Sequence, residues 1–447
     1  MKTSVLNQED TTLQWKPADT WVSWNGNVRH SYRGKVVVHS EEDISRAIAS
    51  SRSVRMTGNG QSSADIVAGT DVLLDPSEYN GILEFDRDEG TITVQSGIRL
   101  KELMQALERE GWTLPCLPDI DTVTLGGAIS TGTHGTTGGA HPIAESMIRC
   151  TLVQADGSVL TVHEGDEIMP AIRCGLGVLG VLSTITMQCV PLYWLRVTEE
   201  AVPDAVWTKE YQAWLRDYAF VRVIWLPHTG YAWVVRGQRI DEDTPVDEQQ
   251  APARIAKRRE VSKALYARTI RFPRFTRLAN RILKRLFFSH STVVKGTLYG
   301  ATVTKSRGST LELGEWTVDR ARFDELFSEL QALLDSRDND AYAHIPMDIR
   351  FLDADETWLS NAYGRPTVTV GCVTRNAEHA DSYQAFALVE ELFLRYGGRP
   401  HWAKRFDAKA AELRSLYPRW DDFLALRERM DPKGTFLTPY LRSLLGV

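Results

Sequence analysis

The chain has 447 residues, of which 43% are hydrophobic and 25% charged, a composition typical of a globular protein with a sizeable core divided among about two or three domains. Lys and Arg number 52 against 58 Asp and Glu, and the formal net charge of -6 argues against a general DNA- or RNA-binding protein. Because the polar N-terminus has no apolar signal core, no apolar run is long enough to span a membrane, and the five cysteines are widely spaced, we expect reduced thiols and a cytoplasmic location.

Short strands and helices alternate between about residues 18 and 190. Ser40 followed by Asp43 is a capping pattern, and the one-turn spacing of Ile44 and Ile48 after it predicts a helix over 41–51. Further along we expect a strand at 53–57, a strand at 91–95, a helix that carries Leu100, Leu103 and Leu107 before Gly111, and a hairpin around Asp156-Gly157. This alternation is typical of an α+β or α/β unit.

The sequence changes character after about residue 195. The stretch VRVIWLPHTGYAWVV at 221–235 predicts a hairpin around Thr229-Gly230. The acidic residues 241–248 precede a stretch at 254–285 that is rich in Lys and Arg and has Glu260 as its single acid, which indicates an exposed excursion with amphipathic helices broken at Pro273. Later elements are a helix with Phe323, Leu326, Phe327, Leu330 and Leu334 on one face, a buried strand at 365–375, and a helix at 382–396 that ends at Gly397-Gly398.

The first glycine-rich segment is MTGNGQSS at 56–63. Such a turn directs successive backbone N–H groups into a concave nest, and glycine lets a phosphate approach closely. Its spacing is not that of the Rossmann fingerprint, and no Walker A sequence is present. Taken alone, an ordinary tight turn is an equally good interpretation.

The second segment is DIDTVTLGGAISTGTHGTTGG at 119–139, where small and hydroxyl residues surround apolar Val123, Leu125 and Ile129. We expect a buried loop whose backbone polar groups need partners, which a large polar ligand can supply. The alternative is a loop packed on its own sheet. Together the two segments, about 60 residues apart, suggest one long cofactor with a pyrophosphate.

Four ordered motifs resemble the FAD domain of the vanillyl-alcohol-oxidase flavoprotein superfamily. They are Trp21-x-x-Trp24-Asn25-Gly26, Thr57 to Ser63, Leu125 to Gly135, and Gly175 to Thr186. Within this superfamily the chain resembles the aldonolactone oxidases and dehydrogenases, with the alditol oxidases as relatives, because VRVIWLPHT and His401-Trp402-Ala403-Lys404 are similar to that branch's strand and H-W-x-K motif. The resemblance extends over residues 18–440 and is weakest across 240–310.

The resemblance implies a two-domain α+β flavoprotein, with an FAD-binding domain at 15–192 and a substrate (cap) domain at 193–447 that contains the basic excursion at 254–290. The FAD-binding residues that it implies are Thr57, Gly58, Asn59, Gly60, Gln61, Ser62, Ser63, Asp119, Thr124, Gly126, Gly127, Thr131, Gly132, Thr133, His134, Gly180, Val181 and His401. Gln61 stands where many members carry the histidine that links FAD covalently, so we expect non-covalent FAD.

The resemblance also implies catalytic roles. Lys404 would lie near the substrate oxygen and flavin N1–C2, and Arg350 would hold the substrate or its oxyanion. Asp348 would orient Arg350 and accept a hydroxyl proton, although the branch usually has glutamate there. His401 would contact the flavin or complete the cluster, and His134 would support flavin contacts, with no metal site expected. The alternatives are an ordinary ion pair for Asp348 and Arg350, and core packing for His401 and Trp402.

The function that follows from the resemblance is oxidation of a hydroxyl group in an aldonolactone, sugar or polyol by hydride transfer to flavin N5. Electrons would pass to oxygen, a quinone or another acceptor. One alternative is a tailoring oxidase of a larger glycoside or secondary metabolite, and another is a flavin-binding protein without turnover. The basic stretch is interpreted as a solvated cap, with peripheral contact to an anionic membrane as the less favoured possibility.

Overall fold

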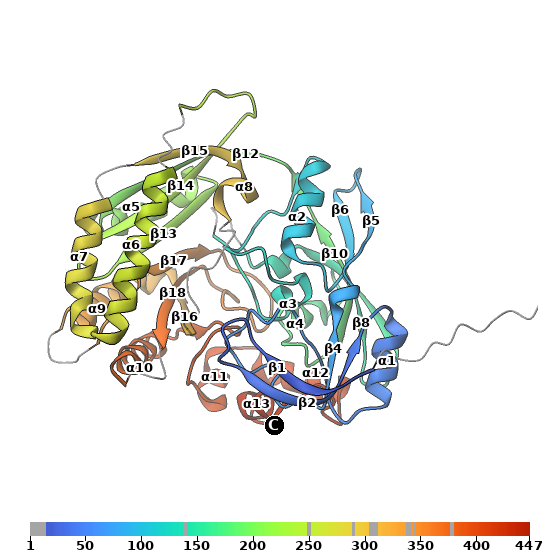
Figure 1. Ribbon diagram of the computed structural model, residues 1–447. Coiled ribbons are helices and arrows are strands. Elements are labelled where there is room, and N and C mark those ends of the chain that lie inside the picture. Colours follow the sequence, from blue (N-terminus) through green and yellow to red (C-terminus); the bar gives the residue numbers. More distant parts are fainter. Residues whose placement is uncertain are drawn as a thin grey trace, which may run out of the picture.

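The computed structural model describes residues 15–136, 141–247, 252–287, 291–303, 312–336, 341–343, 345–375 and 380–447. Two sheet-containing parts lie side by side in Figure 1: an N-terminal part coloured blue to cyan, and a second part coloured green to orange. The red C-terminal helices lie beneath both.

The N-terminal part contains three sheets. A four-stranded sheet has the order β1 (Trp15–Val22), β2 (Arg29–Val37), β4 (Val72–Asp75), β3 (Val54–Met56), and a five-stranded antiparallel sheet has the order β5 (Ile82–Asp86), β6 (Thr91–Gln95), β10 (Val181–Gln188), β8 (Met147–Val153), β9 (Val159–His163). The short strands β7 (Trp112–Thr113) and β11 (Val190–Pro191) form a pair. The strands predicted at 53–57 and 91–95 and the hairpin at Asp156-Gly157 are thereby confirmed.

Local signals explain the helices of this part. The N-terminus of α1 (Glu41–Ala49) carries the predicted capping box, because Ser40 Oγ accepts from the Asp43 N–H and Asp43 accepts from the Ser40 N–H. The helix α2 (Leu100–Arg109) buries Leu100, Leu103 and Leu107, as their spacing predicted. The short helix α4 (Met169–Ile172) precedes β10.

The prediction of a loop over 119–139 was wrong in part. Residues Leu125–Ser130 form the short helix α3, whose N-cap Thr124 accepts a hydrogen bond from the Gly127 N–H. The rest of the segment up to residue 136 is irregular and buried or half-buried, and residues 137–139 lie outside the described part of the chain.

The second part is built on an eight-stranded antiparallel sheet. Its order is β15 (Thr292–Thr297), β12 (Trp194–Pro203), β14 (Tyr231–Ile240), β13 (Phe220–Leu226), β17 (Met347–Leu352), β18 (Thr367–Arg375), β16 (Glu312–Asp319), β19 (Arg399–Pro400). The predicted hairpin at 221–235 is the β13–β14 pair. The strand predicted at 365–375 is β18.

One face of this sheet is covered by helices. They are α5 (Asp204–Asp217), α9 (Phe323–Asp335) and α10 (Ala380–Arg395), which pack on alternate residues of β13, β17 and β18. The predicted helix at 323–334 is confirmed with all five apolar residues buried, and α10 confirms the helix predicted at 382–396. The small helix α8 (Leu298–Thr302) follows β15. The opposite face of the sheet is turned to the N-terminal part.

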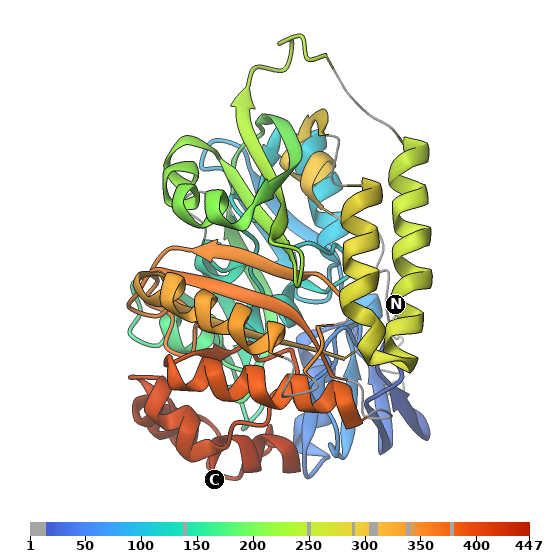
Figure 2. The same ribbon diagram turned by 90° about the vertical axis from the view of Figure 1, so that its left-hand side faces the viewer.

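The basic excursion forms two helices, α6 (Pro252–Arg271) and α7 (Thr276–Phe287), joined at Pro273 as predicted. They run side by side along the edge of the second part (Figure 2). Residues 288–290 of the predicted excursion lie outside the described chain. Among the described residues, none of the helices combines the length and apolar character needed to cross a bilayer.

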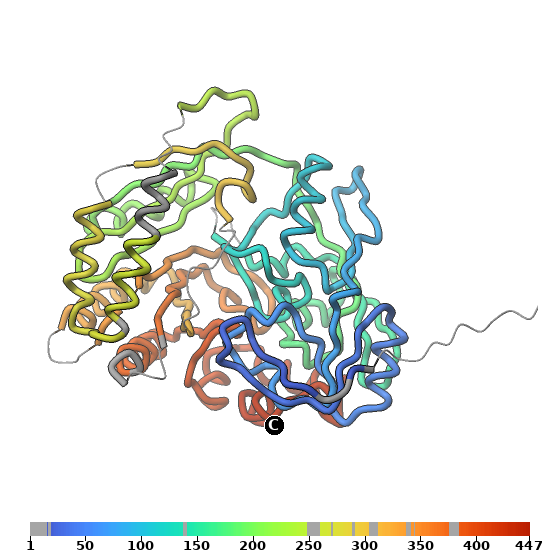
Figure 3. The backbone as a smooth tube through the Cα atoms, viewed as in Figure 1, coloured from blue at the N-terminus to red at the C-terminus, as the bar shows by residue number. Residues whose placement is uncertain are grey.

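The C-terminal helices α11 (Ala410–Leu416), α12 (Trp420–Met430) and α13 (Pro439–Leu445) return to the N-terminal part, as the red trace beside the blue one in Figure 3 shows. Their apolar residues join the same core as α2 and the five-stranded sheet. The Val54 N–H donates to the Thr435 carbonyl at 2.9 Å, so the end of the chain extends the hydrogen bonding of β3.

Candidate active site

A cavity of about 860 Å³ lies between the glycine-rich segments of the N-terminal part and the open face of the eight-stranded sheet. Most of the residues that the sequence analysis assigned to the site line this cavity. They are Thr57, Gly58, Asn59, Gly60, Gln61, Ser62, Asp119, Thr124, Gly126, Gly127, Thr131, Thr133, His134, Gly180, Val181, Arg350, His401 and Lys404. Ser63, Gly132 and Asp348 do not line it.

The glycines of the two segments let the backbone pack against neighbouring residues more closely than a residue with a Cβ would allow. A Cβ on Gly58 would lie 2.6 Å from Thr124 Oγ1, so the two segments touch each other at this glycine. A Cβ on Gly126 would lie 2.9 Å from Ser96 Cβ, and Gly60 has a φ of +65°, which favours glycine. The resulting cradle is backbone-lined and suits a large polar ligand.

Two polar side chains of this cradle, Gln61 and Arg55, bear on which ligand it can bind. Gln61 Oε1 is buried and has no hydrogen-bond partner within the described chain, which is a position that a ligand donor can satisfy. Arg55 donates to the carbonyls of Leu176, Gly177 and Phe436, and burial lowers the pKa of its guanidinium to about 10. It therefore keeps its positive charge at neutral pH beside the cradle, where it favours an anionic ligand.

On the sheet face, two arginines and two aspartates form a partly buried cluster. Arg222 donates to Asp348 at 2.8 and 3.0 Å and to Asp119 at 2.8 Å. Arg350 donates through Nε to Asp348 at 2.9 Å and also pairs with Asp119. The cluster thus joins the second glycine-rich segment, through Asp119, to strands β13 and β17.

Asp348 belongs to this cluster but does not line the cavity. It is 4% exposed, and both of its oxygens accept from arginines. Burial would raise the pKa of Asp348, but Arg222 and Arg350 hold it at about 2. Asp348 is therefore positioned to orient Arg350, as the sequence analysis expected, but it is a poor acceptor for a substrate proton because its lone pairs are already engaged.

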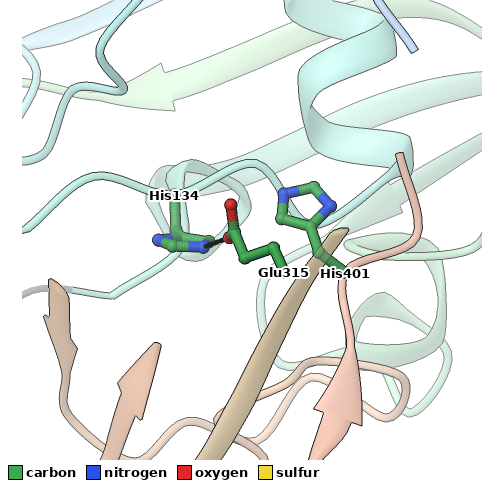
Figure 4. Close-up of side chains that lie close together, drawn as sticks. All are labelled: His134, Glu315 and His401. Atoms are coloured by element: carbon green, nitrogen blue, oxygen red, sulfur yellow. Dashed lines mark hydrogen bonds and ion pairs between the residues drawn. The ribbon is translucent and has the colours of Figure 1, made fainter. Parts of the chain in front are cut away.

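A second cluster brings together His134, Glu315 and His401, whose side chains point toward one another in Figure 4. His134 Nε2 lies 2.7 Å from Glu315 Oε1, and the rings of His134 and His401 have centroids 5.5 Å apart. Burial would raise the pKa of Glu315, but His401, His134 and Lys404 together lower it well below its usual value. Glu315 is therefore a carboxylate.

The backbone fixes which ring nitrogens carry protons. His134 Nδ1 lies 3.0 Å from the Gly135 carbonyl and must donate to it, so the His134–Glu315 contact holds one proton between Nε2 and Oε1. His401 Nδ1 accepts from the Ala403 N–H at 3.0 Å, which leaves its Nε2 as the protonated nitrogen. Burial lowers the pKa of His401 to about 3, so this ring is a neutral hydrogen-bond donor at neutral pH.

The ligand atoms of His134, Glu315 and His401 lie within 4.8 Å of one another, a spacing that could also accommodate a metal ion. No such set was visible in the sequence, because its members lie far apart along the chain. The direct bond between His134 and Glu315 already satisfies one ligand atom of each. We assign no metal to this cluster.

The H-W-x-K segment contributes two residues to the cavity wall and one to the core. Lys404 is half-buried and lines the cavity, and its backbone N–H donates to the His401 carbonyl at 2.9 Å. Trp402 is buried against Tyr417 and Trp420, and its Nε1–H donates to the Leu359 carbonyl. Core packing is therefore the structural role of Trp402, whereas His401 and Lys404 face the cavity.

Arg55, Arg222, Glu315 and Cys372 are among the cavity-lining residues that sequence reasoning missed. Arg222 alternates with core residues within VRVIWLPHT, which was a usable signal for a charged residue on the open face. The sequence around Glu315 gave no such signal, because strand 312–319 was not predicted. Cys372 has a φ of 63°, and burial raises the pKa of its thiol to about 12, so it stays protonated.

Comparisons with known proteins agree on the family. Residues 185–444 match the family described as D-arabinono-1,4-lactone oxidase, and residues 33–163 match the FAD binding domain. An L-gulono-1,4-lactone dehydrogenase of Mycobacterium tuberculosis is 30% identical over 95% of this chain and 99% of its own length. An L-gulonolactone oxidase of Mus musculus is 27% identical over 92% and 94%, and a Streptomyces alditol oxidase 26% identical over 95% and 98%.

Solved structures support the same architecture. A solvent-stable cholesterol oxidase superimposes with a TM-score of 0.77 at 16% identity, covering 96% of this chain and 97% of its own. A cholesterol oxidase from Brevibacterium sterolicum gives 0.76 at 15% identity over the full length of both chains. At this identity the likeness concerns the fold alone, and it confirms the predicted two-domain flavoprotein fold.

Proposed function

The chain belongs to the D-arabinono-1,4-lactone oxidase family, and from this premise we propose that it is an FAD-dependent oxidoreductase that oxidises a hydroxyl group of an aldonolactone, sugar or polyol. The observation that carries the proposal is the meeting of two walls at one cavity: a glycine cradle with the unpartnered Gln61 oxygen on one side, and the cations Arg350 and Lys404 on the other. FAD, when bound, supplies the two-electron acceptor for the hydride that leaves the carbinol carbon.

The positive groups stabilise negative charge that develops on the substrate oxygen. Arg350 is held rigidly by Asp348 and Asp119, so its remaining N–H groups are preorganised toward the cavity. Lys404 adds a second cation on the cavity wall, and the neutral His401 adds an Nε2–H donor. Because these groups are fixed before substrate arrives, little reorganisation is needed as charge develops.

We propose that the hydroxyl proton is taken up at the His134–Glu315 pair and not at Asp348. Glu315 lines the cavity, is a carboxylate, and already shares a proton with His134 Nε2. A proton added to Glu315 leaves its contact with His134 in place, whereas one added to Asp348 would break contacts with two arginines. Asp348 is a positioning residue in this scheme.

Four further features belong to the proposal. FAD is held non-covalently by the cradle residues at 57–63, 119–134 and 180–181. The FAD-binding and substrate domains divide at 192/193. Electrons pass to oxygen, a quinone or another acceptor, and the protein works in the cytoplasm. Gln61 supports the first of these features, because an amide does not form the covalent link that histidine forms in related flavoproteins.

The test of function is anaerobic flavin reduction. Holoenzyme is mixed in a stopped-flow instrument with L-gulono-1,4-lactone, D-arabinono-1,4-lactone and xylitol, and the loss of oxidised-flavin absorbance is followed. We expect at least one compound to bleach the flavin, and mixing the reduced enzyme with oxygen or a quinone then identifies the acceptor. Oxidised flavin that survives all three, and longer glycosides as well, would establish the alternative of a flavin-binding protein without turnover.

Peripheral membrane contact is the alternative to a purely cytoplasmic location. The exposed side of α6, α7 and the turn between them carries Lys263, Arg268, Arg271, Arg274, Arg281 and Arg285 together with exposed Phe272, Leu278 and Leu286. Our proposal predicts that the protein stays in the supernatant with anionic vesicles at low salt. The membrane alternative is correct if the protein sediments with the vesicles at low salt but not at high salt. Sedimentation should then also be lost in a variant with four arginines changed to Gln, at Arg271, Arg274, Arg281 and Arg285.

A further inference from the structure

The sheet face of the cavity changes from charged to apolar across neighbouring strands. In the register of the sheet, Ile224 of β13 lies opposite Asp348 of β17 on one side and opposite Trp233 of β14 on the other. Arg350 and Glu315 line the cavity on the β17–β16 side, whereas Ile224 and Trp233 line it on the β13–β14 side. Apart from Arg222 near the start of β13, the charged side chains of the sheet wall therefore lie on the β17–β16 side.

The β13–β14 side of the cavity wall, which we call the apolar half, becomes less polar along β13. Its alternate residues Arg222, Ile224 and Leu226 line the cavity, while Val221, Val223 and Trp225 between them are buried in the core on the opposite face. Along this strand the wall passes from a cation paired with two aspartates to two aliphatic side chains within four residues.

The helices α6 and α7 complete this apolar half from outside the sheet. Leu283 and Phe287 of α7 and Tyr266 of α6 line the cavity, and all three pack with Leu226. None of these residues belongs to the glycine-rich segments that form the cradle. Toward solvent, α6 contributes Glu260, Ser262 and Lys263 to the lining; Glu260 and Lys263 are exposed, so this end of the cavity reaches the surface.

We propose that the apolar half is a subsite for a hydrocarbon or aryl group attached to the oxidised sugar, lactone or polyol, which makes the substrate an amphiphile. This inference rests on the proposed function for the oxidised head group. The hydroxylated head lies against Arg350, Lys404 and the His134–Glu315 pair, and the apolar group extends over Ile224 and Leu226 beneath Tyr266 and Phe287 toward the exposed end of α6.

The physical reason is complementarity along the wall. A free polyol has hydroxyl groups at both ends, and those placed against Ile224, Leu226 and Phe287 would lose water without gaining hydrogen bonds. A hydrocarbon group in the same place is removed from water, and each buried methylene tightens binding by about threefold to fourfold. The wall therefore discriminates in favour of substrates with one polar end and one apolar end.

The experiment measures binding along a chain-length series. Holoenzyme with oxidised flavin is titrated with methyl, n-butyl, n-hexyl and n-octyl β-D-glucopyranoside below their micelle concentrations, and Kd is taken from the perturbation of the flavin absorption spectrum. We expect Kd to fall about 10-fold or more between the methyl and n-hexyl compounds, since several methylenes are buried. A Kd that does not change along the series overturns the proposal.

Variants locate the effect. Ile224→Ser and Tyr266→Ala, on two sides of the subsite, should each flatten the dependence of Kd on chain length, and Ile82→Ser, an exposed isoleucine of β5, should retain the wild-type dependence. Thermal unfolding and flavin content establish that each variant is folded. A chain-length dependence that is the same in both subsite variants as in wild type places the hydrocarbon elsewhere and contradicts the proposal.

Failure of the proposed function is distinguishable from failure of this inference. Flavin that is bleached by a lactone or polyol, with no chain-length effect on Kd, leaves the oxidoreductase proposal standing and removes the subsite. A chain-length effect that Ile224→Ser abolishes, with no compound able to reduce the flavin, keeps the apolar subsite and removes the proposed reaction.

Discussion

His134 and Glu315 come from opposite walls of the cavity, yet His134 Nε2 and Glu315 Oε1 lie 2.7 Å apart. His134 lies in the irregular part of the glycine-rich segment that follows α3, and Glu315 lies within β16 of the eight-stranded sheet. Both side chains are buried, so the contact is shielded from solvent and holds the two walls in a fixed relation.

Replacing Glu315 by Gln removes the negative charge of this pair while keeping its size. We expect the free energy of unfolding to fall by about 1–3 kcal/mol, because an amide is a weaker acceptor for the buried His134. Flavin reduction should fall more strongly, since the proton acceptor is lost. Urea unfolding and stopped-flow reduction measure the two effects, with the exposed Glu84→Gln as a control. Unchanged flavin reduction in Glu315→Gln would show that the hydroxyl proton is accepted elsewhere.

His401 should make the protein less stable in acid. The unfolded residue takes up a proton near pH 6.5, whereas burial keeps the folded residue neutral down to about pH 3. Stability therefore declines as pH falls from 6.5 toward 3, by up to about 1 kcal/mol per pH unit from this residue. Urea unfolding at pH 7.5 and 5.5 should show a smaller difference in His401→Gln than in wild type. The exposed His163→Gln should behave like wild type, and equal pH effects in all three proteins would contradict the assignment.

Lys404→Met should reduce the rate of flavin reduction by about 10²–10³, because a positive charge beside the developing oxyanion is lost. Flavin content should stay close to that of wild type, since the cradle residues are unchanged. The comparison uses single-turnover reduction at saturating substrate, with the exposed Lys409→Met as the matched control. Near-normal reduction in Lys404→Met would remove this lysine from the proposed mechanism.

Arg350→Lys keeps the charge but loses the planar fork that Asp348 and Asp119 hold. We expect kcat/KM to fall about 10- to 100-fold, the equivalent of one or two charge-assisted hydrogen bonds. Arg414→Lys on the exposed surface of α11 should leave kcat/KM unchanged. Wild-type kinetics in Arg350→Lys would mean that the substrate does not depend on the guanidinium geometry.

The flavin should be released when the holoenzyme is precipitated with acid. Gln61 cannot make the link that histidine makes, and Cys116 does not line the cavity, with a thiol pKa that burial raises to about 11. After precipitation and centrifugation, flavin fluorescence should be found in the supernatant. Colour that remains in the washed pellet would show covalent attachment.

The sequence allowed prediction of elements whose signals are local. Ser40 and Asp43 are three residues apart, and the leucines of α2 repeat within one helix, so both patterns can be interpreted without knowledge of the rest of the chain. The helix α3 escaped prediction because glycines at 126 and 127 disfavour a helix, whereas the Thr124 cap and burial of Leu125 favour it in the folded protein.

The site residues also divide into those with a local sequence signal and those whose place depends on contacts between distant parts of the chain. The residues placed on the cavity wall in advance came from the two glycine-rich segments, the pair Gly180 and Val181, Arg350 and the H-W-x-K motif. Arg222 and Glu315 were missed because their partners, Asp348 and His134, are 126 and 181 residues away along the chain. Nothing in the neighbouring sequence specifies which strand of the eight-stranded sheet will present its charged face to the cradle, since that depends on strand order and register.

The path of the C-terminal segment determines when the cradle is completed during synthesis. Arg55 donates to the carbonyls of Leu176, Gly177 and Phe436, and Val54 N–H donates to Thr435. The N-terminus of a nascent chain leaves the ribosome first. The buried Arg55 therefore lacks the Phe436 carbonyl as an acceptor until almost the whole protein has been synthesised. The cavity wall that carries Arg55 is therefore completed only when almost the whole chain has been made, and a chain truncated before residue 435 has an Arg55 that is only partly satisfied beside an unfinished β3 strand.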